Sequence, residues 1–393
     1  MKPVVKIVER NKCSGCEACK ESCPQKAITM ERDIDGFFFP RINDEICIDC
    51  GMCGKVCPVD KTISFRSIQY NDTVAYGGCL EDKKILSKSA SGGFFPALAK
   101  KVLEKDGVVF GVTMEKNFRS AHYQSSDEIS IQKMQGSKYV TAKKDSVYTR
   151  IKIELNQGRQ VLFVGLPCEV VALYSFLDRD YENLLTCELI CAGTSSYNLL
   201  DAQLDWFENK YQGKTEEFSF RFKKYGWVPC SIMARTGQKS YSKMFDETIF
   251  GVGMKYAKRN ACFNCVYKDA RRLADFTIGD FWRIDQKASY YNEEGTSVIF
   301  SRTDKAVKTM DTLSDFFFEK VSAEAAQLGN FQQLKRGAGV PEERAAYLKV
   351  LRERGGFEAY KQFKPKQTIS TKIKNHLPVK LYKLFRRLEG KLH

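Results

Sequence analysis

Two cysteine runs near the amino end decide the fold of the first part of this chain: Cys13-Ser-Gly-Cys16-Glu-Ala-Cys19-Lys-Glu-Ser-Cys23-Pro24 and Cys47-Ile-Asp-Cys50-Gly-Met-Cys53-Gly-Lys-Val-Cys57-Pro58. Both have the spacing C-x2-C-x2-C-x3-C-P, in which three close thiolates hold one [4Fe-4S] cluster and the fourth cysteine crosses to the other cluster. The spacing predicts one cluster on Cys13, Cys16, Cys19 and Cys57, and a second on Cys47, Cys50, Cys53 and Cys23. Zinc is the alternative occupant of such thiolates, but the doubled, crossed arrangement favours iron–sulphur clusters. The runs therefore indicate one-electron transfer and leave the substrate open.

The stretches around these runs predict a bacterial-type two-cluster ferredoxin domain over residues 1–66. Residues 28–40 alternate as a hairpin around Asp35-Gly36, and strands are expected at Met1–Arg10 and Thr62–Phe65. Residues 67–86 are expected to be a linker, residues 87–345 a larger second domain, and residues 346–393 a helical basic tail. The predicted class is α+β, with the small ferredoxin-like domain followed by a larger α/β domain.

Composition places the chain in a reducing compartment. Of its 393 residues, 15 are cysteines, clustered at ligand spacing rather than spread as in a disulfide-stapled secreted domain. No signal segment opens the chain, and no apolar run approaches the roughly 20 residues that span a bilayer. A cytoplasmic location is therefore expected. Nucleic acid is not an expected partner, because zinc-finger spacing, a basic recognition helix and an aromatic RNA-binding signature are all missing.

From about residue 87, apolar strands alternate with helical stretches, which is typical of an α/β domain. The small-residue loop Ser89-Ala-Ser91-Gly92-Gly93 precedes a helix expected at Phe94–Leu103. Free N–H groups at such a helix start favour an anion, commonly a phosphate. Small loops before helices are common, however, so a purely structural loop stays open on this feature alone. Buried strands are expected at Gly107–Thr113, Val161–Gly165 and Leu184–Ile190.

A series of further motifs follows in a fixed order. They are Gly-Ser-Lys-Tyr (136–139), Gly-x-Pro-Cys (165–168), Cys-x-Gly (191–193), Phe-Arg-Phe-Lys with Gly-Trp (220–227), Cys-x2-Cys (262–265), Asp-x3-Gly-Asp-Phe-Trp (275–282) and Gly-Thr-Ser-Val (295–298). Together with the Ser-Gly-Gly loop, they resemble the β subunit of coenzyme F-420 hydrogenase/dehydrogenase and its bacterial relatives. The resemblance spans about residues 89–300, and the ferredoxin domain makes it the longer, electron-input form of that family.

The resemblance implies a flavin, usually FAD, and a third [4Fe-4S] cluster, so that residues 87–345 would form a flavin- and iron–sulphur-binding oxidoreductase domain. The implied flavin-binding residues are Ser89, Ser91, Gly92, Gly93, Gly136, Ser137, Lys138 and Tyr139. The implied ligands of the third cluster are Cys168, Cys191, Cys262 and Cys265. Spacing alone establishes only the Cys262/Cys265 pair, so zinc or structural thiols remain alternatives there. Cys79, Cys187 and Cys230 are expected to be buried apolar residues, with Cys187 as a substitute ligand the alternative.

One departure from the family's sequence pattern concerns the deazaflavin coenzyme. The family's Cys-His-Gly-x-Pro-Ser reads Cys191-Ala-Gly-Thr-Ser-Ser196 here, so the histidine is replaced by Ala192 and use of the deazaflavin coenzyme is in doubt. No catalytic residue is identified. If a side chain supplies a proton, the candidates are Lys138, Tyr139, Glu169 and Asp280, each of which could instead be structural.

The carboxyl end carries much of the formal charge of +15. Between Lys364 and His393, nine Lys or Arg stand against one Glu. Leucines from Leu377 to Leu392 recur at helical spacing, which is typical of an interfacial helix on an anionic membrane. A helix packed on the body with a solvated basic face is the alternative. Peripheral membrane contact through this tail is the expectation.

Together these features predict an iron–sulphur flavoprotein oxidoreductase. Single electrons would come from a donor such as ferredoxin, a reduced deazaflavin or a nicotinamide, and pass through the clusters to FAD. The flavin would reduce an unknown organic substrate, by analogy in surface-polysaccharide metabolism. The alternative is an electron-transfer subunit without its own substrate that serves a partner dehydrogenase or reductase.

Overall fold

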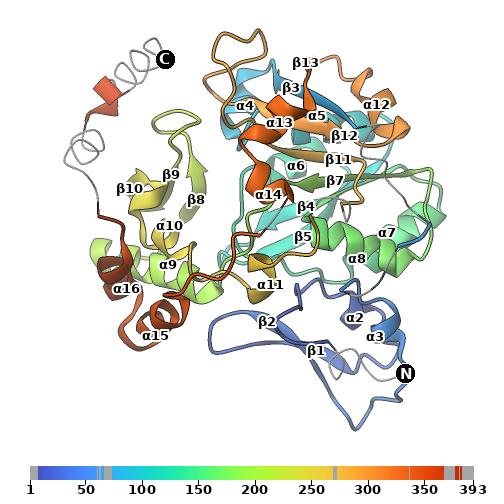
Figure 1. Cartoon of the computed structure of the whole chain (residues 1–393), viewed down its shortest axis with the longest axis horizontal. Coiled ribbons are helices and arrows are strands. Elements are labelled where there is room, and N and C mark those ends of the chain that lie inside the picture. The colour runs from blue at the N-terminus through green and yellow to red at the C-terminus, as the bar shows by residue number, and fades with distance from the viewer. Residues whose placement is uncertain are drawn as a thin grey trace.

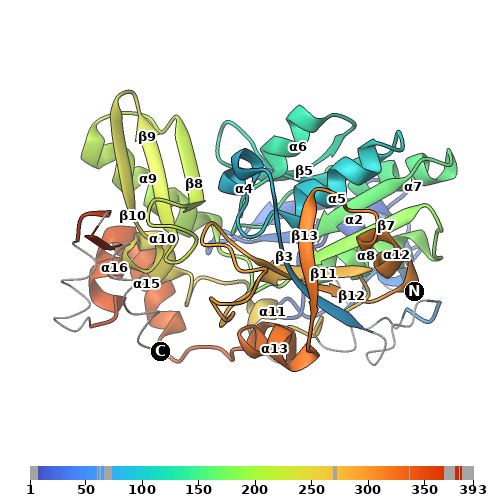
Figure 2. The same ribbon diagram turned by 90° about the horizontal axis from the view of Figure 1, so that it is seen from above.

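The computed structural model describes residues 8–59, 61, 63–65, 73–268, 272–335, 337–366, 377–379 and 381–382. Figure 1 shows a small amino-terminal part, a large sheet covered by helices, and a three-stranded sheet with helices of its own. Figure 2, turned by 90°, shows the three-stranded sheet beside the large one. The mixture of helices and strands confirms the α+β class.

The amino-terminal part is built on the two cysteine runs. Strands β1 (Ile28–Arg32) and β2 (Phe38–Ile42) form the predicted antiparallel hairpin. Helix α2 (Ala18–Glu21) carries Cys19, and helix α3 (Met52–Lys55) carries Cys53. The strand expected at 62–65 is wrong for the described residues, because Ile63 packs into the core of the large domain instead of pairing with the hairpin. Thr62 and residues 1–7 of the other expected strand lie outside the described residues.

The large sheet has eight described strands, with a parallel centre and antiparallel edges. In spatial order they are β13 (Phe316–Val321), β3 (Val74–Leu80), β12 (Ser297–Ser301), β11 (Phe276–Asp280), β7 (Leu184–Leu189), β6 (Val161–Gly165), β4 (Val108–Met114) and β5 (Ser120–Ser125). Strands β4, β6, β7 and β11 run parallel. The predictions at 107–113, 161–165 and 184–190 are confirmed as β4, β6 and β7.

The linker expected at 67–86 is wrong over its described part. Residues 74–80 form β3 inside the large sheet, and Lys83–Lys88 form α4. Gly77 and Gly78 let neighbouring groups lie against the strand: a Cβ on Gly77 would meet the ring of Tyr290 at 2.5 Å, and one on Gly78 would meet the Phe317 carbonyl at 2.5 Å. A glycine pair is therefore a packing feature of a buried strand here, not a sign of a loose connection.

Helices cover both faces of the parallel centre, so its strands are apolar on both sides. Alternate residues of β4 face opposite layers: Val108 and Phe110 pack on one face, and Val109 on the other. The first face carries α7 (Val147–Asn156) and α8 (Pro167–Leu177). The second carries α5 (Phe94–Leu103), α6 (Glu128–Met134) and α12 (Asp304–Met310).

The three-stranded sheet belongs to a separate lobe with its own core. Its strands are β8 (Glu217–Phe222), β9 (Ser231–Thr236) and β10 (Lys239–Met244). Its helices are α9 (Tyr197–Tyr211), α10 (Ile249–Gly253), α15 (Arg344–Arg354) and α16 (Gly356–Phe363). The smaller elements of the chain are η2 (Phe245–Glu247), α11 (Asn260–Phe263), α13 (Ala323–Leu328) and α14 (Phe331–Lys335).

The boundary of the expected tail at 346 is corrected by this lobe. Tyr347 of α15 is fully buried and stacks on Tyr256 at 4.8 Å, so residues up to Phe363 belong to the lobe's core. Most of the leucine stripe lies outside the described residues. Of the described remainder, Tyr382 is buried and meets Tyr225 edge-on at 5.2 Å. Within the described part of the chain, no helix combines the length and apolarity that crossing a bilayer requires.

Candidate functional site

The first predicted sulfur group consists of Cys13, Cys16, Cys19 and Cys57, which lie near one another. Cys16 and Cys19 both lie within electrostatic range of Cys13 and of Cys57, the cysteine that crosses from the second run. Burial raises the pKa of the Cys16 thiol to about 12. A thiolate at such a position needs positive charge close by, which iron supplies, so this donor set fits a cluster.

The second predicted group lies farther out. Cys53 and Cys23 pack in a small apolar cluster with Ile28, next to Cys19 and Cys57 of the first group. Cys50 is exposed, and Cys47 is half-buried. Cys53 and Cys23 therefore share a core with the first group, and Cys50 stands at the surface.

Four cysteines of the large domain form a third group. Cys168 stands in the first turn of α8 and lies within electrostatic range of the other three, Cys191, Cys262 and Cys265. Cys191 follows β7 and accepts a hydrogen bond from the Gly193 amide at 3.2 Å. Gly193 has φ +109°, and a Cβ there would lie 2.9 Å from the Cβ of Cys262, so only glycine brings these segments together.

The spacing of these groups bears on what they could hold. Among the described residues, no three Cys, His, Asp or Glu side chains converge tightly enough for a single metal ion. The third group is nevertheless surrounded by cations, because Lys258, Lys268 and Arg272 all interact electrostatically with its cysteines. Positive charge stabilises thiolates and any negatively charged cluster that they carry.

Tyr267 lies between the first and third groups. Its side chain is 3% exposed and packs in one core with Cys16, Cys168 and Cys265. It interacts electrostatically with Cys16 and Cys57 on one side and with Cys168 and Cys265 on the other. Its hydroxyl is buried and has no hydrogen-bond partner in the described part of the chain. Sequence reasoning missed this residue, because its position depends on the docking of two domains.

That docking is made by polar contacts beside the cysteines. The hydroxyl of Tyr148 on α7 donates to the carbonyl of Cys16 at 2.8 Å, and that of Ser175 on α8 donates to the carbonyl of Val56 at 2.9 Å. Figure 1 shows the amino-terminal part against α7 and α8.

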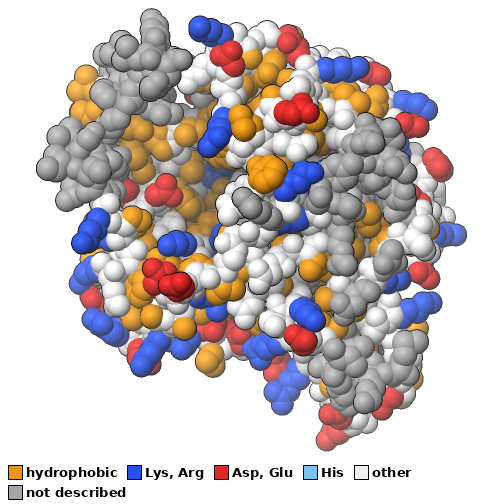
Figure 3. Space-filling view, in the orientation of Figure 1, with side chains coloured by type: hydrophobic (Ala, Val, Ile, Leu, Met, Phe, Trp, Pro, Cys, Tyr) orange, Lys and Arg blue, Asp and Glu red, His pale blue; other side chains and the backbone are white. Residues whose placement is uncertain are grey.

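A cavity of about 780 Å³ lies between the large sheet and the three-stranded sheet. Figure 3 shows a hollow with hydrophobic side chains beside the lobe of β8–β10. The large sheet contributes residues at the carboxyl ends of β6, β7 and β11, and the lobe contributes residues from 221, 228–230 and 244–247. Cys191 lines this cavity, so the third sulfur group forms part of its wall.

Seven of the eight residues predicted for flavin line this cavity: Ser89, Ser91, Gly93, Gly136, Ser137, Lys138 and Tyr139. The eighth, Gly92, is not in the lining. A Cβ on Gly92 would lie 2.4 Å from the Gly78 carbonyl and 2.4 Å from the Ser297 amide, so this glycine packs the loop against the sheet. The loop itself leads into α5, whose first residues border the cavity.

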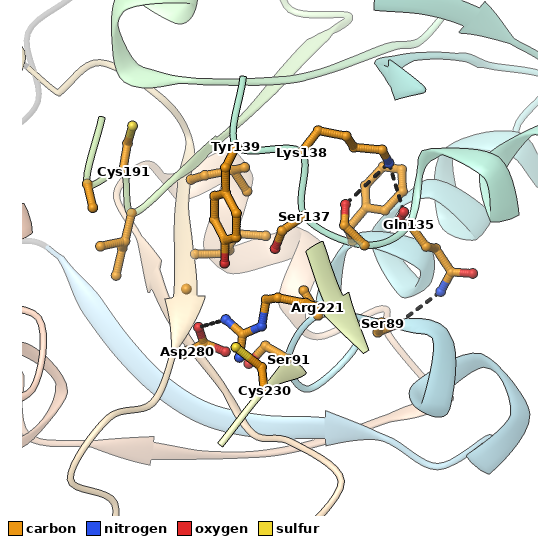
Figure 4. A pocket seen from close by; sticks show the side chains of 18 of the residues that line it. Ser89, Ser91, Gln135, Ser137, Lys138, Tyr139, Cys191, Arg221, Cys230 and Asp280 are labelled. Atoms are coloured by element: carbon orange, nitrogen blue, oxygen red, sulfur yellow. Dashed lines mark hydrogen bonds and ion pairs between the residues drawn. The ribbon is translucent and has the colours of Figure 1, made fainter. Parts of the chain in front are cut away.

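Most polar atoms of this loop are already engaged within the fold. Ser89 Oγ donates to the Ile85 carbonyl at 3.0 Å, and Ser91 Oγ donates to the Thr296 carbonyl at 2.8 Å. Figure 4 shows Ser89 next to Gln135, whose amide donates to its hydroxyl. These hydroxyls therefore shape the loop and use their hydrogens within the protein.

Lys138 caps a helix rather than reaching into the open cavity. Its ammonium donates to the carbonyls of Met134 and Gln135, both at 2.8 Å, at the end of α6 (Figure 4). Burial lowers the pKa of Lys138 to about 7, whereas carbonyls at a helix carboxyl end favour the charged ammonium. A direct phosphate contact is therefore not made by this lysine in the arrangement observed.

Two other proton-donor candidates, Glu169 and Tyr139, differ in protonation state. The Glu169 carboxylate pairs with Lys144 Nζ at 2.7 Å and with His122 Nε2 at 3.3 Å. Burial alone would raise the pKa of Glu169, but these two partners hold it far below its usual range. Glu169 is thus an ionised structural group. Burial raises the pKa of Tyr139, which keeps its hydroxyl protonated at the cavity.

Three further cysteines were expected to be buried apolar residues. Cys187 is fully buried within β7 and packs in the sheet core, and Cys79 is buried in β3, so the expectation is confirmed for both. It is wrong for Cys230, which lines the cavity beside Arg221. The motifs around Arg221 and Asp280 contributed to the family resemblance. Asp280 was also a proton-donor candidate, and its carboxylate pairs with Arg221. Ala192, which stands where the family has histidine, also lines the cavity.

The fold and its sulfur groups define an iron–sulphur electron-transfer protein. Residues 12–61 match the 4Fe-4S dicluster domain, and residues 158–324 match the family described as the carboxyl-terminal part of the coenzyme F420 hydrogenase/dehydrogenase beta subunit. The chain thus combines a 4Fe-4S dicluster domain with a segment similar to the carboxyl-terminal part of coenzyme F420 hydrogenase/dehydrogenase β subunits.

Known proteins resemble different parts of the chain. The F subunit of the F(420)H(2) dehydrogenase of Methanosarcina mazei is 21% identical over 329 residues, which cover 79% of this chain and 85% of that protein. The VorC subunit of the ketoisovalerate oxidoreductase of Methanothermobacter marburgensis is 33% identical over 60 residues, 15% of this chain and 76% of that protein. A polypeptide of the F420-reducing [NiFe] hydrogenase complex from Methanosarcina barkeri aligns with a TM-score of 0.46 and 16% identity, covering 76% of this chain and 93% of that one.

Proposed function

We propose that this protein passes single electrons from its two ferredoxin-type clusters, through a third cluster on Cys168, Cys191, Cys262 and Cys265, to a flavin in the cavity, where an organic substrate is reduced. The observation that carries the proposal is the unbroken series from one sulfur group to the next. Tyr267 contacts the first and third groups, and Cys191 of the third group stands in the cavity wall.

The series also has a direction in space. The group with exposed Cys50 is the one that an external donor could approach, and the group with Cys16 faces the large domain. We infer that electrons enter beside Cys50 and leave the ferredoxin part beside Tyr267. A ferredoxin, a reduced deazaflavin protein or a nicotinamide-dependent reductase would suit as donor, since typical ferredoxin clusters have potentials near about −400 mV.

The cavity has the character that a flavin needs. Its walls include apolar side chains such as Phe94, Met244 and Trp282, and its polar groups include the hydroxyls of Ser137 and Tyr139. The amino end of α5 adds partial positive charge, which suits the phosphates of FAD. A bound flavin would supply the exchange between one-electron carriers and two-electron chemistry. Surface-polysaccharide metabolism as the setting is part of the proposal and rests on the family resemblance.

A second candidate is an electron-transfer subunit that has no substrate of its own. The names of the relatives favour it, because they describe subunits or a complex. Isolation of the chain with a constant partner, and no turnover without it, would favour this candidate. Flavin reduction by the isolated chain followed by substrate turnover would favour the first.

Iron and flavin analysis of anaerobically purified protein tests the proposal. Three clusters correspond to about twelve irons per chain, and we expect about one FAD that is bleached by reduced ferredoxin. The double variant Cys262→Ser/Cys265→Ser should drop to about eight irons and lose ferredoxin-driven bleaching while keeping FAD. Cys187→Ala, a buried cysteine outside every group, should keep about twelve. Clusters at full occupancy without any flavin binding would refute the flavin part, and an iron content unaffected by the double variant would refute the third cluster.

A further inference from the structure

Arg221 is a buried cation with an unused hydrogen-bond donor at the cavity. It stands on β8, its side chain is 6% exposed, and it lines the cavity. Its Nη1 donates to Asp280, the last residue of β11. Its Nη2 is buried and finds no hydrogen-bond acceptor among the residues that the structure describes. A buried charged donor without an acceptor is unfavourable, which indicates that a ligand supplies the acceptor.

The guanidinium is held rigidly. Asp280 accepts a second hydrogen bond from Trp227 Nε1 at 2.7 Å, so its carboxylate is fixed from two sides. The ring of Trp227 stacks on that of Trp282 at 5.7 Å with an interplanar angle of 6°, and Trp282 in turn lies 5.8 Å from the guanidinium carbon. Figure 4 shows the Arg221–Asp280 pair facing the interior of the pocket. A fixed planar fork of this kind selects flat or tetrahedral oxyanions.

Charged groups of both signs surround Arg221. Lys223, the residue after the end of β8, interacts with Glu294, Arg221 and Asp280, so it adds a second cation beside two carboxylates. The hydroxyl of Tyr139 lies within electrostatic range of Arg221 and adds a neutral donor. Asp246, near Cys230, is a further carboxylate, and burial together with the neighbouring Glu247 raises its pKa.

We propose that Arg221, steadied by Asp280 and Trp227, forms an oxyanion-binding subsite that receives a phosphate or carboxylate group of a ligand in the cavity. This inference rests on the same cavity as the proposed function. The oxyanion has two sources: the phosphates of the flavin, or an acidic substrate lying beside it.

Sulfate binding and flavin affinity, measured on the full chain with its clusters loaded, test the subsite. Titration calorimetry of the flavin-free protein with sulfate should detect binding that Arg221→Gln weakens about ten- to a hundredfold, the range for a hydrogen bond to a charged group. Arg221→Lys keeps the positive charge but loses the planar guanidinium, so its sulfate affinity should lie between those of the wild type and Arg221→Gln. Arg235→Gln, on the adjacent strand and 46% exposed, is the matched control and should behave as wild type.

The affinities for FAD, FMN and riboflavin separate the two sources. Weaker binding of FAD and FMN but not riboflavin by Arg221→Gln assigns the subsite to a flavin phosphate. Unchanged flavin affinities, with sulfate binding to the flavin-loaded protein lost, assign it to the substrate. If Arg221→Gln does not fold, Arg221→Lys carries the comparison.

Failure of the two proposals can be told apart. A protein that binds no flavin, yet binds sulfate in an Arg221-dependent way, would refute the flavin and keep the subsite. Sulfate and flavin affinities that are all unchanged in Arg221→Gln would overturn the subsite.

Discussion

Replacing Gly92 by alanine tests whether the loop before α5 is a packing element. The new Cβ would stand 2.4 Å from the Gly78 carbonyl of β3 and 2.4 Å from the Ser297 amide of β12. Both are backbone atoms inside the sheet and cannot swing aside. Relief requires the loop to withdraw, which breaks the hydrogen bonds from Leu80 N to Gly92 O, 2.7 Å, and from Gly92 N to Ser297 Oγ, 3.0 Å.

The size of the effect follows from these contacts. Overpacking costs about 1–3 kcal/mol, and each lost hydrogen bond costs about 1 kcal/mol more, so Gly92→Ala should destabilise the protein by about 3–5 kcal/mol. Gly136→Ala is the matched control from the same predicted set. Gly136 has φ +77°, but its nearest neighbour to a Cβ is 4.0 Å away, so only backbone strain of about 1–2 kcal/mol applies.

Thermal unfolding under anaerobic conditions, at one scan rate for all variants, measures the difference. At about 2 °C per kcal/mol for a chain of this size, the apparent Tm should fall by about 6–10 °C for Gly92→Ala and by about 2–4 °C for Gly136→Ala. Equal losses, or a larger loss for Gly136→Ala, would refute the packing explanation. A normal Tm for Gly92→Ala combined with lost FAD affinity would instead restore Gly92 as a phosphate contact.

Two further predictions concern Tyr267 and Lys223. Tyr267→Phe removes a buried hydroxyl that can donate a hydrogen bond to a cluster sulfur. An EPR-monitored redox titration should therefore show a lower reduction potential for a neighbouring cluster at unchanged iron content. Identical potentials in the wild type and the variant would count against that hydrogen bond. Lys223 faces Glu294, Arg221 and Asp280, and burial lowers its pKa to about 8. Because Lys223 is then a cation below pH 8 and neutral above, sulfate affinity should fall between pH 7 and pH 9. In Lys223→Met the sulfate affinity should no longer change over this pH range. A pH dependence that persists in Lys223→Met would exclude this lysine as its cause.

Much of the fold is readable from local pattern. The helix Phe94–Leu103 and the strand Val161–Gly165 have the predicted bounds, because uninterrupted apolar periodicity between clear loop residues marks both ends. Strand β3 was missed because its Gly77-Gly78 pair resembles a flexible connection. Its place depends on Tyr290 and Phe317, which lie more than two hundred residues away along the chain. Contacts between residues so far apart along the chain cannot be recognised from a short stretch of sequence.

The candidate site, like the fold, could be predicted from the sequence only in part. Cysteine spacing predicts the first crossed group, since three of its ligands are close in sequence and the doubled pattern assigns the fourth to the other run. Lys138 was placed at the flavin by the family resemblance, whereas the short return to the end of α6 lets it cap that helix. Arg221 and Tyr267 were not foreseen as functional, because each matters only through partners on other elements, Asp280 for one and Cys16 for the other.

The topology explains why the third sulfur group and the cavity coincide. In a parallel sheet the carboxyl ends of the strands open at one edge, where the connecting loops place functional residues. Here β6 ends at Gly165 and leads into Cys168, while β7 ends at Leu189 and leads into Cys191. Strand β11, parallel to β7, ends at Asp280, which holds Arg221 across the cavity. The same sheet edge thus carries the sulfur ligands on one side of the cavity and the anchor of the cationic subsite on the other, so a ligand bound between them would lie in contact with both.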